Sequence, residues 1–248
     1  MIVIPMVGLS SRFFKEGYTR PKYQLNLGGI SVFEHAIRSF SAYFHEERFR
    51  FLVRSDYGAA DFVREVLGRL NVRHVEVHEF DQDTRGQAET VYLGLRDVSE
   101  DESLYIFNID TFRPGFSKPC MESVCDGYLE VFCGEGEHWS FVLPGKEARV
   151  IRTTEKERIS DLCSDGLYYF RRKGDFDAVF REALSDGDTV RNEYYIAPLY
   201  NRLIRDGKDI RYHLIDGDDV IFCGTPAEYE SLQVRWGAGQ VWPRYGFQ

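Results

Sequence analysis

The chain has 248 residues, of which 43% are hydrophobic and 29% are charged, a composition that suits a globular protein with a sizeable core. Its formal net charge of −9 argues against a general nucleic-acid binder, since affinity for a phosphate backbone comes mainly from excess lysine and arginine. No apolar run approaches the roughly 20 residues of a membrane helix, and the five cysteines form no CxxC pair. We therefore expect a cytoplasmic protein with no nucleic-acid or membrane partner, and its state as a monomer or homo-oligomer stays open.

The first half of the chain alternates predicted strands and helices. Residues 2–6 are almost wholly apolar and predict a buried strand, and residues 31–44 repeat apolar residues at helical spacing, with Ser31 as a possible N-cap. Further strands are predicted at 49–53, 72–79 and 104–109, and further helices at 61–70 and 88–95. This alternation is typical of a parallel sheet covered by helices.

After Asp110 the pattern changes to shorter alternating strands. These are predicted at 127–133, 139–143, 148–153 and 166–170, followed by helices at 175–184 and 193–206, a strand at 210–215 and a short helix after Pro226. We predict an α/β fold in one domain over residues 1–248, Rossmann-like, with a mostly parallel central sheet flanked by helices and an added antiparallel strand region.

A loop of small residues follows the first predicted strand. Gly8, Ser10 and Ser11 would let backbone N–H groups approach a phosphate at the carboxyl end of that strand. Arg12 and Lys22 could then neutralise developing charge. The alternative is a polar turn with two solvated cations.

Two further segments suggest the same chemistry. Asp110 follows a strongly apolar strand and would be a good ligand for magnesium, which takes one or two carboxylates plus substrate phosphates, although it could also merely cap a turn. In the segment 84–95, Gly86 and Gln87 could face the edge of a nucleobase. An ordinary junction between a loop and a helix is the alternative there.

Six segments in chain order resemble the nucleotidyltransferase superfamily that makes nucleotide sugars, the sugar-1-phosphate nucleotidyltransferases or nucleotide-sugar pyrophosphorylases. The family's opening signature corresponds to GLSSRF at 8–13 and PKYQL at 21–25, its base-contacting turn to RGQAETV and its magnesium-binding aspartate to FNID. In the second half, RTTEKERISDLCSDGLYYF looks like the family's Glu-Lys-Pro and Gly-Leu-Tyr strands, NEYYIAPLYNRLIRDGKDI like its Glu-led helix and CGTPAEYESL like its closing turn. The resemblance implies a GT-A-like fold, with a nucleotide-binding half at 1–112 and an acceptor-binding half at 113–248.

The resemblance also implies an activity, the transfer of a nucleoside monophosphate from a triphosphate to a sugar-1-phosphate with release of pyrophosphate. The product would be a nucleotide sugar for a surface polysaccharide such as a capsule. Arg12, Lys22 and Asp110 would be catalytic, and Asp110 would bind Mg²⁺. The implied nucleotide-binding residues are Gly8, Leu9, Ser10, Ser11, Arg12, Gly86 and Gln87, with Gln87 reading the base.

The acceptor would be held by residues of the second half. Lys156 would bind its phosphate, while Glu155 and Glu193 would bind its hydroxyls. The alternatives are an exposed strand pair for Glu155 and Lys156, and for Glu193 a first-turn acid that stabilises a helix dipole. Trp139 and the pair Tyr194–Tyr195 could flank a ligand, but aromatic residues at such positions are more often core.

Two positions depart from the family pattern, both on the acceptor side. The second magnesium-binding aspartate, two residues before the glycine of the closing turn, is replaced by Phe222. Asp219 is the candidate for supplying that ligand, together with its neighbours Asp216 and Asp218, unless Asp110 serves with phosphates and water alone. A glycine that the family packs against the sugar corresponds to Ser140, which is counted here among the acceptor-binding residues.

These departures keep other activities open. A cytidylyltransferase acting on a non-sugar phosphate or phosphonate would be expected to have a changed acceptor pocket. A glycosyltransferase of related fold would need an Asp-x-Asp pair, and Phe112 occupies the place of the second acid. A non-catalytic nucleotide-binding protein is the remaining alternative.

Overall fold

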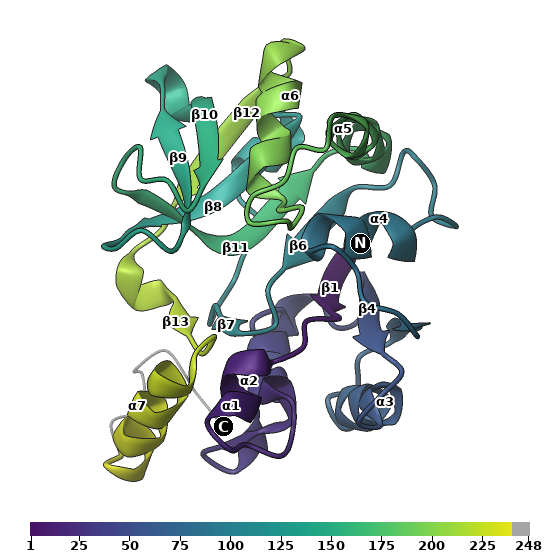
Figure 1. The fold of residues 1–248 in the computed structure, drawn as a ribbon, viewed down its shortest axis with the longest axis vertical. Helices are drawn as coiled ribbons and strands as arrows, with labels where there is room; N and C mark the ends of the chain where they lie inside the picture. The colour runs from purple at the N-terminus through teal and green to yellow at the C-terminus, as the bar shows by residue number, and fades with distance from the viewer. Residues whose placement is uncertain (240–248) are drawn as a thin grey trace.

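A computed structural model describes residues 1–239 of the chain, and Figure 1 shows their mixed α/β fold. Two short ladders accompany a large central sheet. The strands of the large sheet are β1 (Ile2–Met6), β4 (Arg48–Arg54), β5 (His74–Phe80), β6 (Leu104–Phe107), β8 (Gly127–Cys133), β9 (Ser140–Pro144), β10 (Val150–Glu155), β11 (Leu162–Phe170) and β12 (Ile210–Leu214). The short ladders pair β2 (Asn26–Leu27) with β3 (Ile30–Ser31), and β7 (Thr111–Phe112) with β13 (Ile221–Phe222).

The large sheet joins a parallel part to an antiparallel part. Its order is β10-β9-β11-β6-β1-β4-β5, with β8 paired to both β11 and β12. Strands β6, β1, β4 and β5 are parallel, whereas β11 runs antiparallel to β6, β8 and β9. This topology confirms the predicted α/β class, a mostly parallel central sheet flanked by helices with an added antiparallel region.

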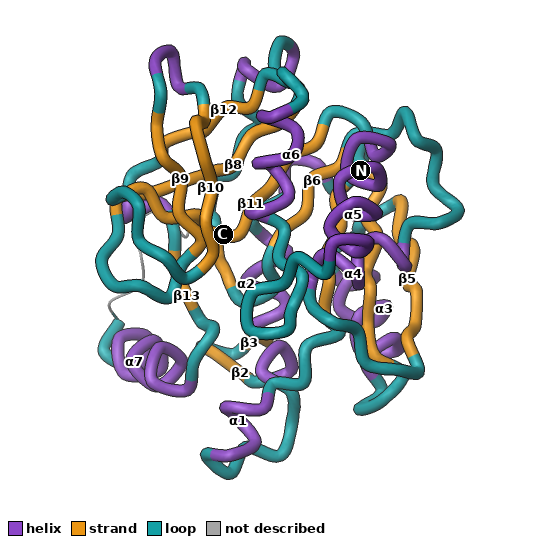
Figure 2. Tube along the Cα trace, turned by 45° about the horizontal axis from the view of Figure 1, so that its top comes forward, coloured by secondary structure: helices purple, strands orange, loops and turns teal. Residues whose placement is uncertain are grey.

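Helices cover both faces of the sheet, as Figure 2 shows. They are α1 (Ser11–Lys15), α2 (Val32–Arg38), α3 (Ala59–Arg69), α4 (Gln87–Gly94), α5 (Lys173–Asp186), α6 (Tyr200–Arg205) and α7 (Pro226–Gly237). Ile2 and Ile4 of β1 join a core with α2 and α3, while Val3 between them joins a second core with α4 and α5. This alternation follows from the two-residue period of a strand, and it explains why the first strand is apolar throughout. Within residues 1–239, no helix is long and apolar enough to cross a lipid bilayer.

The helix predicted at 193–206 was wrong in its first part. Glu193 pairs with Val190 in an isolated bridge, a 3-10 helix covers Ala197–Leu199, and α6 starts only at Tyr200. Pro198 lies inside the predicted helix, where its missing N–H and its ring oppose helical hydrogen bonding. Glu193 therefore belongs to a loop.

Other predicted elements were shortened or shifted. The helix predicted at 31–44 ends at Arg38, although Ser31 caps it as expected by accepting a hydrogen bond from the Glu34 amide. The strand predicted at 104–109 ends at Phe107, and a turn follows in which the Thr111 amide donates to the Asn108 carbonyl at 3.3 Å. The short helix α1, inside the small-residue loop, was not predicted.

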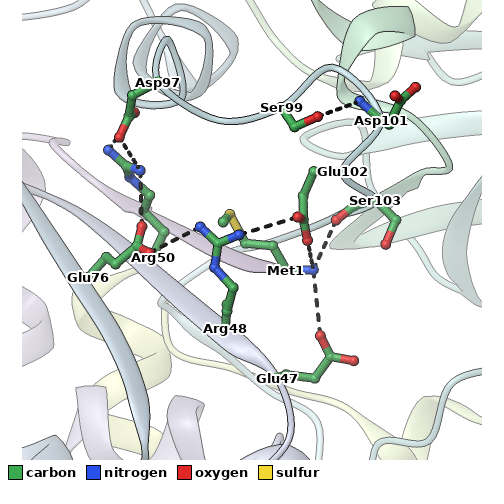
Figure 3. A network of polar contacts seen from close by, with 10 residues as sticks. All are labelled: Met1, Glu47, Arg48, Arg50, Glu76, Asp97, Ser99, Asp101, Glu102 and Ser103. Carbon is green, nitrogen blue, oxygen red and sulfur yellow. Dashed lines mark hydrogen bonds and ion pairs between the residues drawn. The ribbon is translucent and has the colours of Figure 1, made fainter.

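A polar network joins the amino ends of the parallel strands (Figure 3). The terminal ammonium of Met1 lies 3.2 Å from a carboxylate oxygen of Glu102 and donates to the Ser103 carbonyl at 2.9 Å. Arg48 forms ion pairs with Glu102 at 3.3 Å and with Glu76 at 3.1 Å. These contacts tie β1, β4, β5 and β6 together at the edge opposite the carboxyl ends, where ligands of parallel sheets usually bind.

Candidate active site

A cavity of 590 Å³ opens at the carboxyl ends of β1 and β6. It brings together the loop after the first strand, the turn before α4, the turn after β6 that contains Asp110, and two residues of the loop before α6. Its lining includes Gly8, Leu9, Ser10, Ser11, Arg12, Lys22, Thr84, Gly86, Gln87, Asn108, Asp110, Glu193, Tyr195 and Gly224. The three segments predicted from the sequence to act together therefore meet in space.

The small-residue loop is fixed at its turn by Ser10. This residue has a positive φ of 50°, and its side-chain oxygen accepts a hydrogen bond from the amide of Lys22 at 3.2 Å. Non-glycine residues in that backbone region are uncommon and gather at functional sites. The contact brings the segment of Lys22 next to the loop, although 11 residues separate the two positions in the sequence.

Lys22 and Asp110 form an ion pair inside the cavity, with Nζ 2.5 Å from Oδ2. Burial raises the pKa of the Asp110 carboxyl, but the charge and hydrogen bond of Lys22 outweigh it and hold that pKa below its usual value. Each side chain is less than a quarter exposed, so the alternative of a solvated Lys22 is wrong. Asp110 does more than cap a turn, because its carboxylate forms a direct ion pair with Lys22 in the cavity lining.

The closing turn completes this end of the cavity. The amide of Cys223 donates to the carbonyl of Asp110 at 2.8 Å, and a Cβ atom at Gly224 would lie only 2.8 Å from Asp110 Oδ2. Thr225 and Glu228 form a reciprocal capping box at the start of α7. A glycine at 224 thus leaves room beside the Asp110 carboxylate.

The residues present fit a magnesium ion bound mainly through substrate. Residues 1–239 contain no group of three or more His, Cys, Asp or Glu side chains that could hold a metal. Magnesium commonly takes one or two carboxylates plus phosphate oxygens, and Asp110 supplies one carboxylate with open space beside Gly224.

The other aspartates considered as ligands, Asp216, Asp218 and Asp219, are not among the described residues that line the cavity. The ring of Phe222 packs on Trp139, with centroids 4.6 Å apart, and on Phe132 at 5.1 Å. Asp216 caps the 3-10 helix Gly217–Asp219 by accepting from the amide of Asp218. Since β13 pairs Phe222 with Thr111 and Ile221 with Phe112, the chain upstream of Phe222 runs away from Asp110.

The turn before α4 contacts the loop before α6 closely. Gly86 has φ +111°, and a Cβ there would lie 2.6 Å from the Tyr194 carbonyl oxygen. The Tyr194 amide donates to the Arg85 carbonyl at 2.7 Å, and the Ala88 amide donates to the Tyr194 carbonyl at 3.0 Å. The nucleotide-binding and acceptor-binding segments predicted from the sequence are thus hydrogen-bonded to each other.

Gln87 is the first residue of α4, and its side chain is already engaged. Its Nε2 donates to Asn108 Oδ1 at 2.6 Å. The carboxamide therefore points towards the strand end of β6, and a role in reading the base, as the resemblance implies, stays a prediction.

Three of the predicted acceptor residues, Ser140, Glu155 and Lys156, form one connected group, and none of the three lines the cavity. Glu155 lies 3.2 Å from Lys156 Nζ through one oxygen and accepts a hydrogen bond from Ser140 through the other. The side chains of Glu155 and Lys156 are only 5% and 16% exposed, so the alternative of an exposed strand pair is wrong. The helix-dipole alternative for Glu193 is wrong too, because no helix starts at that residue.

The aromatic candidates divide into core and cavity residues. Trp139 packs in a small core with Phe132 and Phe222, and Tyr194 is buried beside Phe180. Tyr195 instead lines the cavity. Asn108 also lines it, and the sequence analysis did not select it, although a polar residue directly after an apolar strand was a usable signal.

Comparison with solved structures decides the family. The structure of a nucleoside-diphosphate-sugar pyrophosphorylase from Vibrio cholerae RC9 is 50% identical in sequence, with a TM-score of 0.91, over 94% of this chain and 100% of that one. The chain belongs to the sugar-1-phosphate nucleotidyltransferase superfamily. This nucleotidyltransferase is therefore an enzyme, as the resemblance implied.

More distant structures share the fold of this nucleotidyltransferase. An inositol-1-phosphate CTP transferase from T. maritima is 17% identical with a TM-score of 0.71, over 94% of this chain and 95% of that one. A UDP-glucose pyrophosphorylase from Acinetobacter baumannii is 14% identical with a TM-score of 0.72, over 96% and 93%. Neither a protein-family model nor a curated protein matches the chain.

Proposed function

We propose that this nucleotidyltransferase transfers a nucleoside monophosphate from a nucleoside triphosphate to a sugar-1-phosphate and releases pyrophosphate. The observation that carries the proposal is a cavity whose lining includes Arg12, Lys22 and Asp110 together with Glu193 and Tyr195. Cations and a metal-binding carboxylate suit a triphosphate, whereas hydrogen-bonding side chains suit a polar acceptor. In this proposal residues 1–112 bind the nucleotide and residues 113–248 bind the acceptor.

The reaction needs positioning and charge neutralisation rather than a protein nucleophile. An oxygen of the acceptor phosphate attacks the α-phosphorus, and the bond from that phosphorus to the oxygen bridging the β-phosphate breaks. Pyrophosphate leaves with the electron pair. In our proposal the loop from Gly8 to Ser11 holds the phosphates, Arg12 stabilises the leaving pyrophosphate, and Lys22 stabilises the charge that builds at the α-phosphate.

We propose Mg²⁺ as the cofactor, held by Asp110. A magnesium ion bound there would neutralise charge on the triphosphate. Lys22 would keep Asp110 ionised, because its positive charge favours the carboxylate form.

The acceptor side keeps a second candidate. Ser140 stands where the resemblance implies a glycine, and its hydroxyl donates to Glu155, so that carboxylate has fewer free acceptor sites for sugar hydroxyls. This observation favours a cytidylyltransferase acting on a non-sugar phosphate or phosphonate as the alternative. For a sugar acceptor, the nucleotide sugar would serve surface polysaccharide assembly in the cytoplasm.

A screen of pyrophosphate release tests the proposal. ATP, CTP, GTP, UTP and dTTP would each be combined with a panel of sugar-1-phosphates and small phosphonates in the presence of magnesium. We expect release with one triphosphate and a sugar-1-phosphate, release only with a phosphonate would favour the alternative, and no release from any pair would refute both.

Two variants extend the screen to the proposed metal site. Asp110→Asn should lower turnover by about 10²–10³-fold while the circular dichroism spectrum is unchanged. Asp101→Asn, on the exposed surface near the amino ends of the strands, should turn over like the wild type. Full activity in Asp110→Asn would remove Asp110 from the metal role.

A further inference from the structure

Tyr195 lies where two proposed acceptor residues from different elements meet. Its ring centroid is 4.0 Å from the ammonium nitrogen of Lys156, and that ammonium donates a hydrogen bond to the Tyr195 hydroxyl. Tyr195 is half-buried, and it lines the cavity together with Glu193. Its neighbour Tyr194 points the other way, into the core beside Phe180.

The hydroxyl of Tyr195 is also influenced by a carboxylate. The negative charge of Glu193 adds to burial in raising the pKa of the tyrosine. A phenolic hydroxyl carries one proton and can also accept hydrogen bonds. It can therefore accept from Lys156, which directly follows β10, and still offer its own proton to the Glu193 carboxylate of the loop before α6.

Lys156 depends on its surroundings to hold its position. It has a positive φ of 58°, a conformation that costs free energy for a non-glycine residue, and its amide donates to the Trp139 carbonyl at 2.8 Å. Glu155 contacts its ammonium at 3.2 Å through one oxygen, and Ser140 donates a hydrogen bond to the other oxygen of that carboxylate. Tyr195 is one of the described residues that line the cavity, whereas Lys156 is not one of them.

We infer that Tyr195 is a positioning residue for the acceptor. In this inference its hydroxyl accepts from the Lys156 ammonium and offers its proton to the Glu193 carboxylate, which keeps the two charged groups in a fixed arrangement. An acceptor with a phosphate and a nearby hydroxyl would meet both groups already placed, which lowers the cost of ordering them on binding. This inference rests on the proposed function.

The replacement Tyr195→Phe tests it, because it keeps the ring and removes only the hydroxyl. With glucose 1-phosphate, or the panel member that turns over fastest, we expect the KM for the acceptor to rise about tenfold, the size typical of a lost hydrogen bond to a charged group. The KM for the triphosphate should stay within about twofold. The hydroxyl accepts a hydrogen bond from Lys156, and the ion pair of Lys22 with Asp110 does not involve Tyr195. The midpoint of urea unfolding should not change.

Tyr212→Phe is the matched control, since Tyr212 lies on β12 and packs against the core of α5 and α6. It should leave both KM values unchanged. If the wild type turns over and Tyr195→Phe has the acceptor KM of the wild type, or if both KM values rise together, the positioning role is refuted and the proposed function stands. If the wild type releases no pyrophosphate, both proposals fall.

Discussion

Two partly buried charges of opposite sign dominate the site at the scale of single residues. Lys22 and Asp110 neutralise each other in the structure, at 2.5 Å and with 22% and 23% of their side chains exposed. An ion pair of this kind contributes little to stability, because the cost of removing both charges from water offsets their attraction. The pair is better explained by function, since a triphosphate and a cation would give each charge a further partner.

His35 of α2, a fully buried titratable residue, links the stability of the fold to pH. Its side chain is fully buried, and its Nε2 lies 2.8 Å from the Leu27 carbonyl oxygen. Burial lowers the pKa of His35 to about 4 from its ordinary value of 6.5. The folded state therefore prefers neutral His35, while the unfolded chain takes up a proton as the pH falls below 6.5.

We expect the free energy of unfolding to decrease as the pH falls from 6.5 towards 4, by about 3 kcal/mol from His35 alone. This contribution is fully present above pH 6.5. Urea unfolding at pH 7 and pH 4.5 would measure it against His35→Gln, which keeps an N–H donor for Leu27 but does not titrate. Parallel pH dependence in the two proteins would show that His35 contributes nothing.

The site residues that could be proposed from the sequence are those that belong to a short, recognisable motif. Lys22 and Asp110 could be proposed from the sequence because each stands in a short local motif, PKYQL and FNID. Contacts between distant segments could not be predicted. Gln87 was expected to read a base, but its partner Asn108 lies 21 residues away, and the partner of Lys156, Tyr195, lies 39 residues away.

At the scale of elements, the start of α4 depends on the absence of a side chain at Gly86. The backbone there combines φ +111° with close approach to the Tyr194 amide nitrogen and carbonyl oxygen. Gly187, which ends α5 with φ +66°, has no atom within 4 Å of the place of a Cβ. The two glycines therefore separate the cost of the dihedral angle from the cost of a clash.

Gly86→Ala should lower the free energy of unfolding by about 2–4 kcal/mol, because backbone atoms of Tyr194 must move as well as the dihedral angle being strained. Gly187→Ala should cost only about 1 kcal/mol. Urea unfolding monitored by circular dichroism would measure both losses of free energy. Equal losses in the two variants would mean that the close contact between Gly86 and Tyr194 contributes nothing to the cost of the Gly86 replacement.

The elements themselves show where periodicity is a safe guide and where it is not. The first strand and α5 were placed within a few residues, because their apolar pattern matches the face they bury. The helix expected at 193–206 failed at Pro198, since apolar spacing continued through a residue that interrupts helical hydrogen bonding. The parallel pairing of β12 with β8 joins segments 83 residues apart, so no local pattern could reveal it.

At the scale of the whole molecule, hydrogen bonds join the two proposed binding halves beside the cavity. The Tyr194 backbone exchanges hydrogen bonds with Arg85 and Ala88, and the Arg85 guanidinium lies 5.1 Å from the centroid of the Tyr194 ring. The loop at 193–195 therefore shares its stability with the turn at 84–90. Ordering one segment should order the other, because opening either requires the same hydrogen bonds to break.

We therefore expect a triphosphate alone, without acceptor, to slow hydrogen exchange in both segments. The triphosphate selected by the activity screen would be added with magnesium, and amide exchange would be followed by mass spectrometry. Peptides covering 84–90 and 193–195 should both gain protection, whereas a peptide covering α3, which packs on β4 and β5, should not change. Protection limited to 84–90 would show that the two halves respond independently. Protection of both would mean that the first substrate prepares the acceptor site through the backbone of Tyr194, before any acceptor binds.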